Sequence, residues 1–446
     1  MKKIEKIKLS TLALVALIST TSINAADAFH KKYLPASQGE PKIASKSIEG
    51  FNILEDFTFK GQIRPRYEMA NVDNLTSVAA NALTVRTHLS VTAGLLEVEG
   101  LSATVGVQSI NNLGYTDYSS PGNIVLNNDG KPYDVIDDPQ AAMITEASLN
   151  YKAGKTALHA GRSQLNLDNQ RFIGTVGWRQ LERSYDTLSA TNTDIENLEL
   201  MAAYVYGYAG VTNVATTETS SVILHAKYKL ADALAITAYD YMIASQHDTM
   251  GIALTGASDL SSVKLDYRAE YAIQKDASME YQIKDTKADA SYYNLDLGAN
   301  FSGILAGINY EVLSGTDGVD NKTNFNPMLG TNHKFNGWAD VFYVGNAGPT
   351  GGLKDFNLRL GYANPSFGKV MAIYHDFASD KSMQAASGTS TNLGSELDLV
   401  YSNKISFVNG LSGLLKYASY AKGDVTSFAN ATNDKQVFWA ELDYKF

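Results

Sequence analysis

Several features are scarce in this chain of 446 residues, and each scarcity excludes a class of protein. Cysteine is absent, which excludes a disulfide framework, a thiolate metal site and a cysteine nucleophile. Charged residues make up only 19%, which is low for a soluble globular protein. No run of about 18 apolar residues occurs, so a helical membrane protein is excluded. Acidic residues outnumber basic ones by 47 to 37, and the net charge of −10 disfavours nucleic acid as a partner.

The first 25 residues predict a cleaved secretory signal. Four lysines at positions 2, 3, 6 and 8 precede a short apolar core at 9–18, and small residues follow up to Ala25. This is the three-part pattern of an export signal, and its apolar core is too short to span a bilayer. Cleavage after Ala25 leaves a mature chain with a net charge of −13. We therefore expect the protein to leave the cytoplasm.

From about Phe57 to the last residue, apolar and polar residues alternate with a period of two. In the segment 263–273, apolar side chains at odd positions alternate with Lys264, Asp266 and Arg268. Successive side chains of a strand point to opposite faces, so each segment has an apolar face and a charged face. The apolar face would pack on a second sheet in a soluble sandwich, and would meet lipid in an outer-membrane barrel.

Three features favour the barrel. Many segments run to about ten residues, the length that a tilted membrane strand needs. Their polar faces carry more Arg, Glu and Asp than a sandwich usually shows. The chain also ends in a strand with Phe438, Leu442, Tyr444 and Phe446 on one face, which resembles the assembly signal of bacterial outer-membrane proteins. We therefore predict an all-β fold, a transmembrane antiparallel β-barrel in the bacterial outer membrane.

The number of strands can be predicted from two rules. Bacterial barrels have an even number of strands, and short periplasmic turns alternate with long outer loops. About 18 segments fit this rule, with 16 or 20 strands as alternatives. The predicted strands are 57–68, 83–93, 101–110, 143–151, 156–163, 183–191, 198–208, 219–229, 234–243, 250–257, 263–273, 290–300, 304–313, 355–363, 368–377, 393–402, 412–421 and 437–446. The connection 314–354 is long enough to hold a further hairpin around Trp338 to Val344, or to fold inward as a gate.

The simplest division of the chain has three parts: a signal peptide at 1–25, an extension at 26–56 and a barrel domain at 57–446. Residues 26–56 lack clear alternation. They could form a periplasmic extension or a small plug, and a mobile terminus is the simpler interpretation.

Arginine is sparse, and most of it is concentrated in one stretch of the chain. Seven of the nine arginines lie between residues 64 and 183. The full set is Arg64, Arg66, Arg86, Arg162, Arg171, Arg179, Arg183, Arg268 and Arg359. Arginine presents a planar fork of donors to carboxylate and phosphate groups, and basic rings at a constriction favour anions. We predict an arginine-lined narrow zone in the lumen. The alternative is that these arginines pair with Glu68, Glu146, Glu182 and Asp186 and only stiffen the wall.

Two segments resemble a known family. The stretch GRSQLNLDNQRFIGTVGWRQ at 161–180, together with KGQIRPRYE at 60–68, resembles the alginate-export-like family of outer-membrane porins. The chain is also similar to the major-outer-membrane-protein porins. Both resemblances imply one barrel of about eighteen strands. The first also implies a monomer with an arginine-rich lumen that conducts an anionic polysaccharide. Its candidate contacts are Arg64, Arg66, Arg86, Arg162, Arg171 and Arg179.

The remaining motifs are weaker. Five aspartates share one loop and could offer oxygen ligands to a structural Ca²⁺ ion, although a solvated loop is the simpler interpretation and we expect no cofactor. They are Asp117, Asp129, Asp134, Asp137 and Asp138. His375 and Asp376 could suggest the general base of a membrane-embedded hydrolase, yet no nucleophile motif accompanies them. The many tyrosines predict aromatic girdles at the membrane interfaces.

We therefore predict a porin, not an enzyme, for passive diffusion of small hydrophilic solutes, favouring anions through the arginines. A dedicated alginate-type export channel, an outer-membrane hydrolase and an adhesin barrel are the alternatives. The expected partners are outer-membrane lipid, the solutes and the outer-membrane assembly machinery. The chain could act as a monomer or as a homotrimer, since trimers are common among porins.

Overall fold

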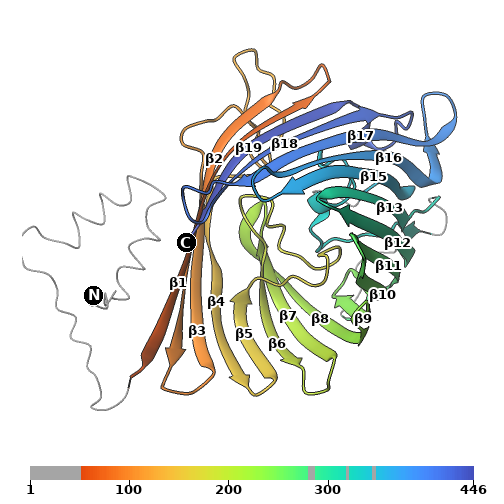
Figure 1. The fold of residues 1–446 in the computed structure, drawn as a ribbon. Coiled ribbons are helices and arrows are strands. Elements are labelled where there is room, and N and C mark those ends of the chain that lie inside the picture. The colour runs from red at the N-terminus through yellow and green to blue at the C-terminus, as the bar shows by residue number, and fades with distance from the viewer. Residues whose placement is uncertain (1–51, 280–286, 318–320, 344–347) are drawn as a thin grey trace, which may run out of the picture.

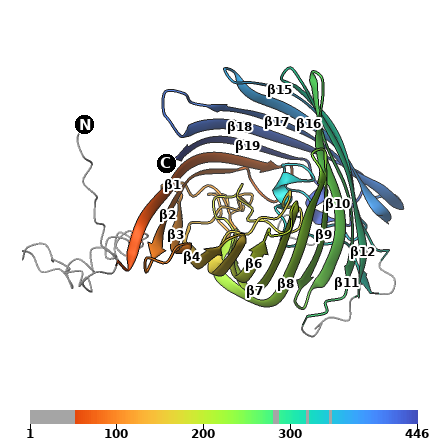
Figure 2. The same cartoon turned by 60° about the horizontal axis from the view of Figure 1, so that its bottom comes forward.

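A computed structural model describes residues 52–279, 287–317, 321–343 and 348–446. Within them, 18 strands form one closed antiparallel barrel (Figures 1 and 2). They are β1 (Leu54–Val72), β2 (Ala80–Leu95), β3 (Leu101–Asn111), β4 (Ala141–Ala153), β5 (Thr156–Ser163), β6 (Ser184–Asn192), β7 (Leu198–Gly210), β8 (Asn213–Ala231), β9 (Leu234–Ile243), β10 (His247–Leu260), β11 (Val263–Lys275), β12 (Lys287–Phe301), β13 (Ile304–Ser314), β15 (Gly352–Asn364), β16 (Gly368–Gln384), β17 (Thr389–Lys404), β18 (Leu411–Lys422) and β19 (Lys435–Lys445).

The remaining regular elements lie in the connections. A two-residue strand, β14 (Lys322–Thr323), pairs in parallel with β12, and two short 3₁₀ helices are η1 (Asn332–Lys334) and η2 (Ala429–Ala431). None of the helices in the described ranges is long and apolar enough to cross a membrane. Each strand of the barrel pairs with its neighbours in sequence, and β1 pairs with β19 to close the ring, with Arg66 opposite Glu441.

Alternation along the strands separates an outer face from an inner face. On β12, Tyr293, Leu295 and Leu297 point outward and are 45%, 61% and 48% exposed. Between them Asn294 points inward and is 5% exposed. The same rule holds around the ring, so the predicted barrel is confirmed and each of the predicted segments overlaps one strand. The ladder begins at Leu54, three residues before the predicted boundary, and the predicted signal peptide and most of the 26–56 extension lie outside the described residues.

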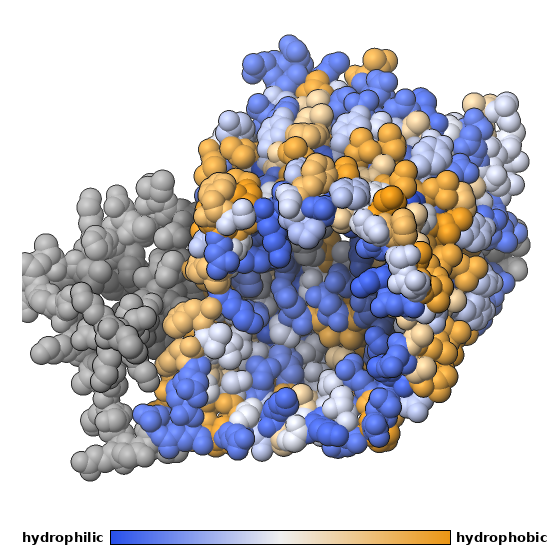
Figure 3. All heavy atoms as spheres, viewed as in Figure 1, coloured by the Kyte–Doolittle hydropathy of each residue, from blue (hydrophilic) through white to orange (hydrophobic). Residues whose placement is uncertain are grey.

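Aromatic side chains gather near the ends of the apolar belt. At the end with short turns, the ring of Phe367 lies 5.3 Å from that of Tyr401. Farther along the strands, Tyr271 and Tyr293 have ring centroids 5.2 Å apart. Aromatic rings with a polar tip suit the boundary between lipid and water, as the girdle prediction requires. Figure 3 shows the same division, with apolar residues along the outside and hydrophilic residues around a central hollow.

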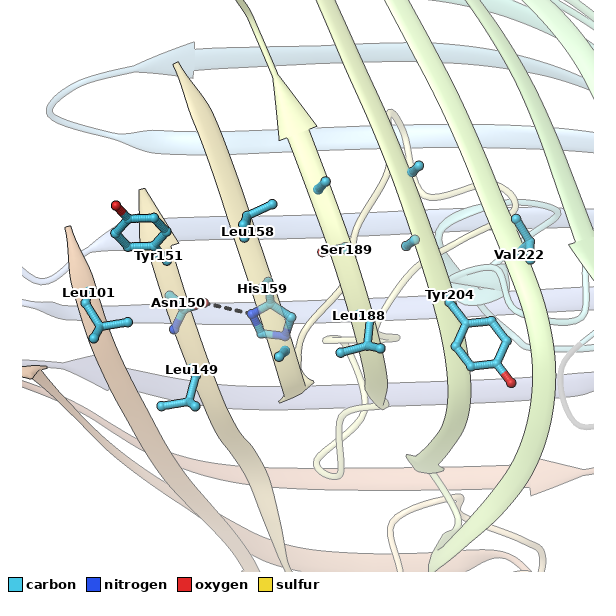
Figure 4. A pocket seen from close by; sticks show the side chains of 14 residues that line it. Leu101, Leu149, Asn150, Tyr151, Leu158, His159, Leu188, Ser189, Tyr204 and Val222 are labelled. Carbon is cyan, nitrogen blue, oxygen red and sulfur yellow. Dashed lines mark hydrogen bonds between the residues drawn. The ribbon is translucent and has the colours of Figure 1, made fainter. Parts of the chain in front are cut away.

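The outer face also has a shallow apolar groove across β3 to β8 (Figure 4). Large side chains such as Leu149 and Leu188 flank small alanines there, which leaves the depression between them. His159 points to the opposite side of the sheet, where its Nδ1 lies 2.8 Å from Oδ1 of Asn150. The side chains of His159 and Asn150 are thus bonded to each other on the inner side, and the groove offers lipid a largely apolar surface.

The two ends of the barrel differ. Short turns such as residues 154–155, 232–233 and 302–303 join strands at one end, as predicted for the periplasmic side. The connections 112–140, 164–183 and 315–351 are at the other end, although some connections there are also short. The predicted hairpin around Trp338 does not form, because the described residues up to Tyr343 form bends that dock inside the barrel; Val344 lies outside the described residues.

Candidate channel constriction

Two inward connections narrow the lumen. We call residues 164–183, between β5 and β6, loop A, and residues 321–343, between β13 and β15, loop B. Figure 2 shows connections lying inside the ring of strands. The loops bind each other through their backbones, because the Gly174 amide donates to the Leu329 carbonyl at 2.9 Å and the Thr331 amide donates to the Gln170 carbonyl at 2.9 Å. They therefore form one docked unit.

Arg64 and Arg66 of β1 point into the lumen as predicted, but loop A covers them. Arg64 donates to the carbonyl oxygens of Gly177 and Arg179 at 2.9 and 2.6 Å. Arg66 donates to the Trp178 carbonyl at 2.6 Å, and its guanidinium carbon lies 4.1 Å from the centre of that indole ring. The two arginines are only 5% and 1% exposed, so a solute in the lumen does not reach them while loop A is docked.

The same arginines are neutralised by carboxylates. Nε of Arg66 donates to Glu441 at 2.8 Å, and Arg86 of β2 is ion-paired with Glu182 of loop A. Three of the four acids proposed as arginine partners do bind arginines, and Glu146 instead lies beside a histidine. The alternative prediction, that the arginines pair with acids of the wall, therefore describes most of them. Arg64, Arg66 and Arg86 anchor loop A.

Arg171 and Arg179 of loop A bind the wall and loop B at once. Nε of Arg171 lies 2.8 Å from Glu311 of β13. Arg179 donates to Glu68 of β1 at 3.1 Å and to Asp340 of loop B at 2.6 Å. Burial alone would lower the pKa of Arg179, but Glu68 and Asp340 raise it well above its usual value. Both guanidiniums are therefore permanent charges in the anchoring network.

Loop B is held by carboxylates of β17. The Ala339 amide donates to Glu396 at 2.7 Å, and the Trp338 amide donates to Asp398 at 3.1 Å. Both acids are buried. Because an amide bound to a carboxylate makes a strong hydrogen bond in a low dielectric, these contacts fix the backbone of loop B on the wall.

Arg183 differs from the other arginines. No described residue gives it a carboxylate partner, and its guanidinium carbon lies 6.0 Å from the Tyr208 ring centre. It is half-buried at the edge of a cavity of about 440 Å³. Val176, Met328 and Tyr343 also line this cavity, as do Asp137 and Arg179, which lie 4.0 Å apart as an ion pair.

Arg268 and Arg359 point into the lumen from β11 and β15. Each has one acid: Arg268 lies 2.7 Å from Glu270, and Arg359 lies 2.7 Å from Asp296. The exposed fraction of the side chain is 27% for Arg359 and 13% for Arg268, against 7% for Arg64. Lys334 of loop B is exposed, has no carboxylate partner among the described residues and lies close enough to Arg268 for the two charges to repel. These cations remain available to a solute.

Arg162 does not face the lumen, which corrects its place in the predicted set. In the ladder it lies opposite Ala147, which is exposed on the outer face, and it binds Asp186 at 2.7 Å. Leu188, two residues after Asp186, is 54% exposed to the outside, so alternation puts Asp186 on the outer face as well. Gly161 has a φ of +120°, the irregularity that made the parity here ambiguous.

The histidine and aspartate considered for a hydrolase are split between two faces. His375 is buried on the inner side, and its Nδ1 lies 2.9 Å from Asp355. Asp376, the next residue of the strand, is exposed on the outer face. Alternation therefore prevents the pair from acting together.

Two carboxylates of the acidic loop 112–140 bind backbone amides of β1 and of loop A. Asp134 accepts a hydrogen bond from the Val72 amide at 2.8 Å, and Asp138 accepts one from the Gln180 amide at 2.8 Å. Tyr118 is buried and donates to the Asp138 carbonyl at 3.2 Å. In the described part of the chain, no group of three or more His, Cys, Asp or Glu could hold a metal. Calcium binding stays a prediction that these contacts do not support.

The predicted assembly signal lies on the outer face beside the closing seam. Leu442 and Phe446 are 45% and 58% exposed, and the rings of Tyr444 and Phe446 lie 5.4 Å apart. Phe438 packs against Tyr67 of β1 with ring centres 6.4 Å apart. The apolar side of the last strand is therefore available to lipid.

The sequence indicated that the 314–354 connection could fold inward, but it did not single out Lys416 of β18, which contacts loop B. Lys416 stands at an inward position of its strand, and this parity was a usable signal. Its partner His333 lies 83 residues away, and nothing local connects the two.

Neither a family model nor a curated protein matches this sequence. Solved structures do match the fold. OccK9 (OpdG) of Pseudomonas aeruginosa superposes with a TM-score of 0.68 at 15% identity, covering 89% of this chain and 99% of that one. The chain has an outer-membrane β-barrel fold.

Two further structures agree. OpdK of P. aeruginosa, determined with vanillate, gives a TM-score of 0.65 at 12% identity, covering 89% of this chain and all (100%) of that one. OccAB4 of Acinetobacter baumannii gives a TM-score of 0.65 at 15% identity, covering 88% of this chain and 98% of that one. These likenesses concern the fold. The resemblance to the alginate-export-like family stays a prediction.

Proposed function

We propose that this protein is an outer-membrane channel through which small hydrophilic solutes diffuse passively. The observation that carries the proposal is a closed barrel with an apolar outer face and a polar inner face, narrowed by two docked loops. A barrel of 18 strands is wide enough to leave an aqueous passage unless its lumen is filled. Similarity to OpdK, described as an outer membrane protein, supports the outer membrane as the location.

We further propose that the passage favours anions. Arg183, at the end of loop A, lines the cavity, Lys334 of loop B is exposed, and Arg359 of β15 keeps 27% of its side chain exposed. The fully buried arginines are neutralised by acids and contribute little to this preference. The OpdK structure was determined with vanillate, a carboxylate, which supports small organic anions as solutes of this kind of barrel.

Reversal potentials in a planar bilayer under a salt gradient test this preference. Arg183→Gln and Lys334→Gln should each shift the reversal potential toward cation preference, most clearly at low salt, where charges are least screened. Lys131→Gln is a matched control, because Lys131 is an exposed lysine of the connection 112–140. A cation preference in the wild type, left unchanged by both lumenal substitutions, would contradict the anion proposal.

An export channel for an anionic polysaccharide is less well supported. Five of its six candidate contacts are at most 5% exposed, namely Arg64, Arg66, Arg86, Arg171 and Arg179, and the sixth, Arg162, faces outward. Alginate oligomers that block the current at micromolar concentration would favour this alternative. The oligomeric state, monomer or homotrimer, stays a prediction.

A further inference from the structure

All the tryptophans of the chain surround one lysine. The protein has three tryptophans, Trp178 in loop A, Trp338 in loop B and Trp439 on β19. Nζ of Lys416 on β18 lies 4.0, 3.9 and 5.2 Å from the centres of these three rings. A desolvated ammonium over indole faces is a strong cation–π contact. One wall residue thus binds both loops at the same place.

His333 of loop B completes this site. Its Nε2 lies 2.6 Å from Nζ of Lys416, and its Nδ1 lies 2.6 Å from Asp340. An ammonium group only donates, so Nε2 must accept and the proton of a neutral ring must be on Nδ1. The ring stacks on Trp178, with centroids 4.7 Å apart and an interplanar angle of 2°. The pKa of His333 is lowered to about 3, chiefly by burial and also by the Lys416 charge, while Asp340 acts in the opposite direction.

Charges from every neighbouring element face this site. Asp340 of loop B and Arg179 of loop A lie next to His333. Asp398 of β17 and Arg66 of β1 act on Lys416. If His333 took up a proton, its Nε2–H would point at the Lys416 ammonium, and two donors of like charge would meet at hydrogen-bond distance. The two cations would then repel, and the contact that joins loop B to β18 would be lost.

We propose that Lys416, His333 and the three tryptophans form a latch that holds loops A and B on the barrel wall, and that protonation of His333 opens it. The ligand of this switch is the proton. This proposal concerns how the proposed channel is regulated. Its first readout, the current, rests on the proposed channel function. Its second readout, tryptophan fluorescence, is independent of conduction.

Fluorescence of the intact protein reports this latch without any label, because no tryptophan lies elsewhere in the chain. At pH 7 the wild type should show blue-shifted emission that acrylamide quenches weakly. As the pH falls toward 3, emission should shift to the red, quenching should rise at least twofold, and the open-channel current should rise over the same pH range. A gel assay of heat modifiability shows that the barrel itself stays folded.

His333→Gln is the decisive variant, because glutamine can donate and accept but does not titrate. It should keep the blue-shifted emission at pH 7 and lose the acid transition in both readouts. His159→Gln is the control, since His159 lies on the inner side of β5 and its hydrogen bonds go to Asn150, Gly161 and Ser163 of β4 and β5, so this variant should retain the transition. An unchanged wild-type emission down to pH 3, or the same transition in His333→Gln, would overturn the latch. A fluorescence transition in a protein that shows no conductance would support the latch and refute the channel.

Discussion

Removing the guanidinium of Arg171 should release loop A and loop B from β13 without unfolding the barrel. Arg171 is 1% exposed and binds Glu311 of the wall together with Asn332 and Asn336 of loop B. The substitution Arg171→Met keeps most of the side-chain volume and leaves the Glu311 carboxylate buried without its counter-charge. Breaking a buried ion pair in this way costs about 3–5 kcal/mol.

This free-energy cost changes the fraction of molecules in which loops A and B are docked, and that fraction can be measured. Since about 1.4 kcal/mol is a factor of ten, the ratio of docked to released loops should fall by roughly a hundredfold to several thousandfold. The barrel ladders are untouched, so heat modifiability on gels should stay as in the wild type. Proteinase K added to protein in vesicles should cut within loops A and B much faster, and single-channel records should spend more time at a higher current.

Two comparisons make this prediction refutable. Arg359→Met removes an ion pair with Asp296 that holds no loop, so proteolysis of the loops should stay as in the wild type. Arg171→Met combined with Glu311→Gln removes both charges and should restore part of the docking, because the unpaired buried carboxylate is gone. Cleavage of Arg171→Met at the wild-type rate, or equally fast cleavage of Arg359→Met, would refute the assignment of Arg171 as an anchor.

Two other predictions concern loop mobility and assembly. A Cβ on Gly174 would touch the Thr331 side chain, so the pair Gly174→Cys and Thr331→Cys should form a disulfide in this cysteine-free chain and reduce current fluctuations; fluctuations that a reductant does not restore would count against it. Phe446→Ser should lower the yield of heat-modifiable protein in the outer membrane several-fold, while Tyr374→Ser, elsewhere on the outer face, should not; equal yields would contradict the proposed signal.

The strands could be predicted from the sequence because their signal is local. A strand such as β11 alternates from Val263 to Tyr271, and the need for an even count was consistent with 18 strands, with 16 or 20 as the alternatives. The inward direction of Arg64 and Arg66 followed from the same parity. Nothing local showed that loop A would cover them, because their partners are more than a hundred residues away.

The errors of prediction have physical causes. Arg162 was ambiguous because Gly161 adopts a positive φ, a conformation that the sequence does not specify. The hairpin expected near Trp338 did not form, since Asp398 and Lys416 of the wall bind that segment in an irregular conformation. The sequence showed where arginine was concentrated, but it did not show which arginines were neutralised.

Single-channel recording of the purified, folded wild type in a planar bilayer tests the central claim most directly. The account predicts stepwise currents, a reversal potential on the anion side under a salt gradient and a shift of that potential in Arg183→Gln. Folded, heat-modifiable protein that inserts into the bilayer and gives no stepwise current would contradict the claim that this barrel is a channel.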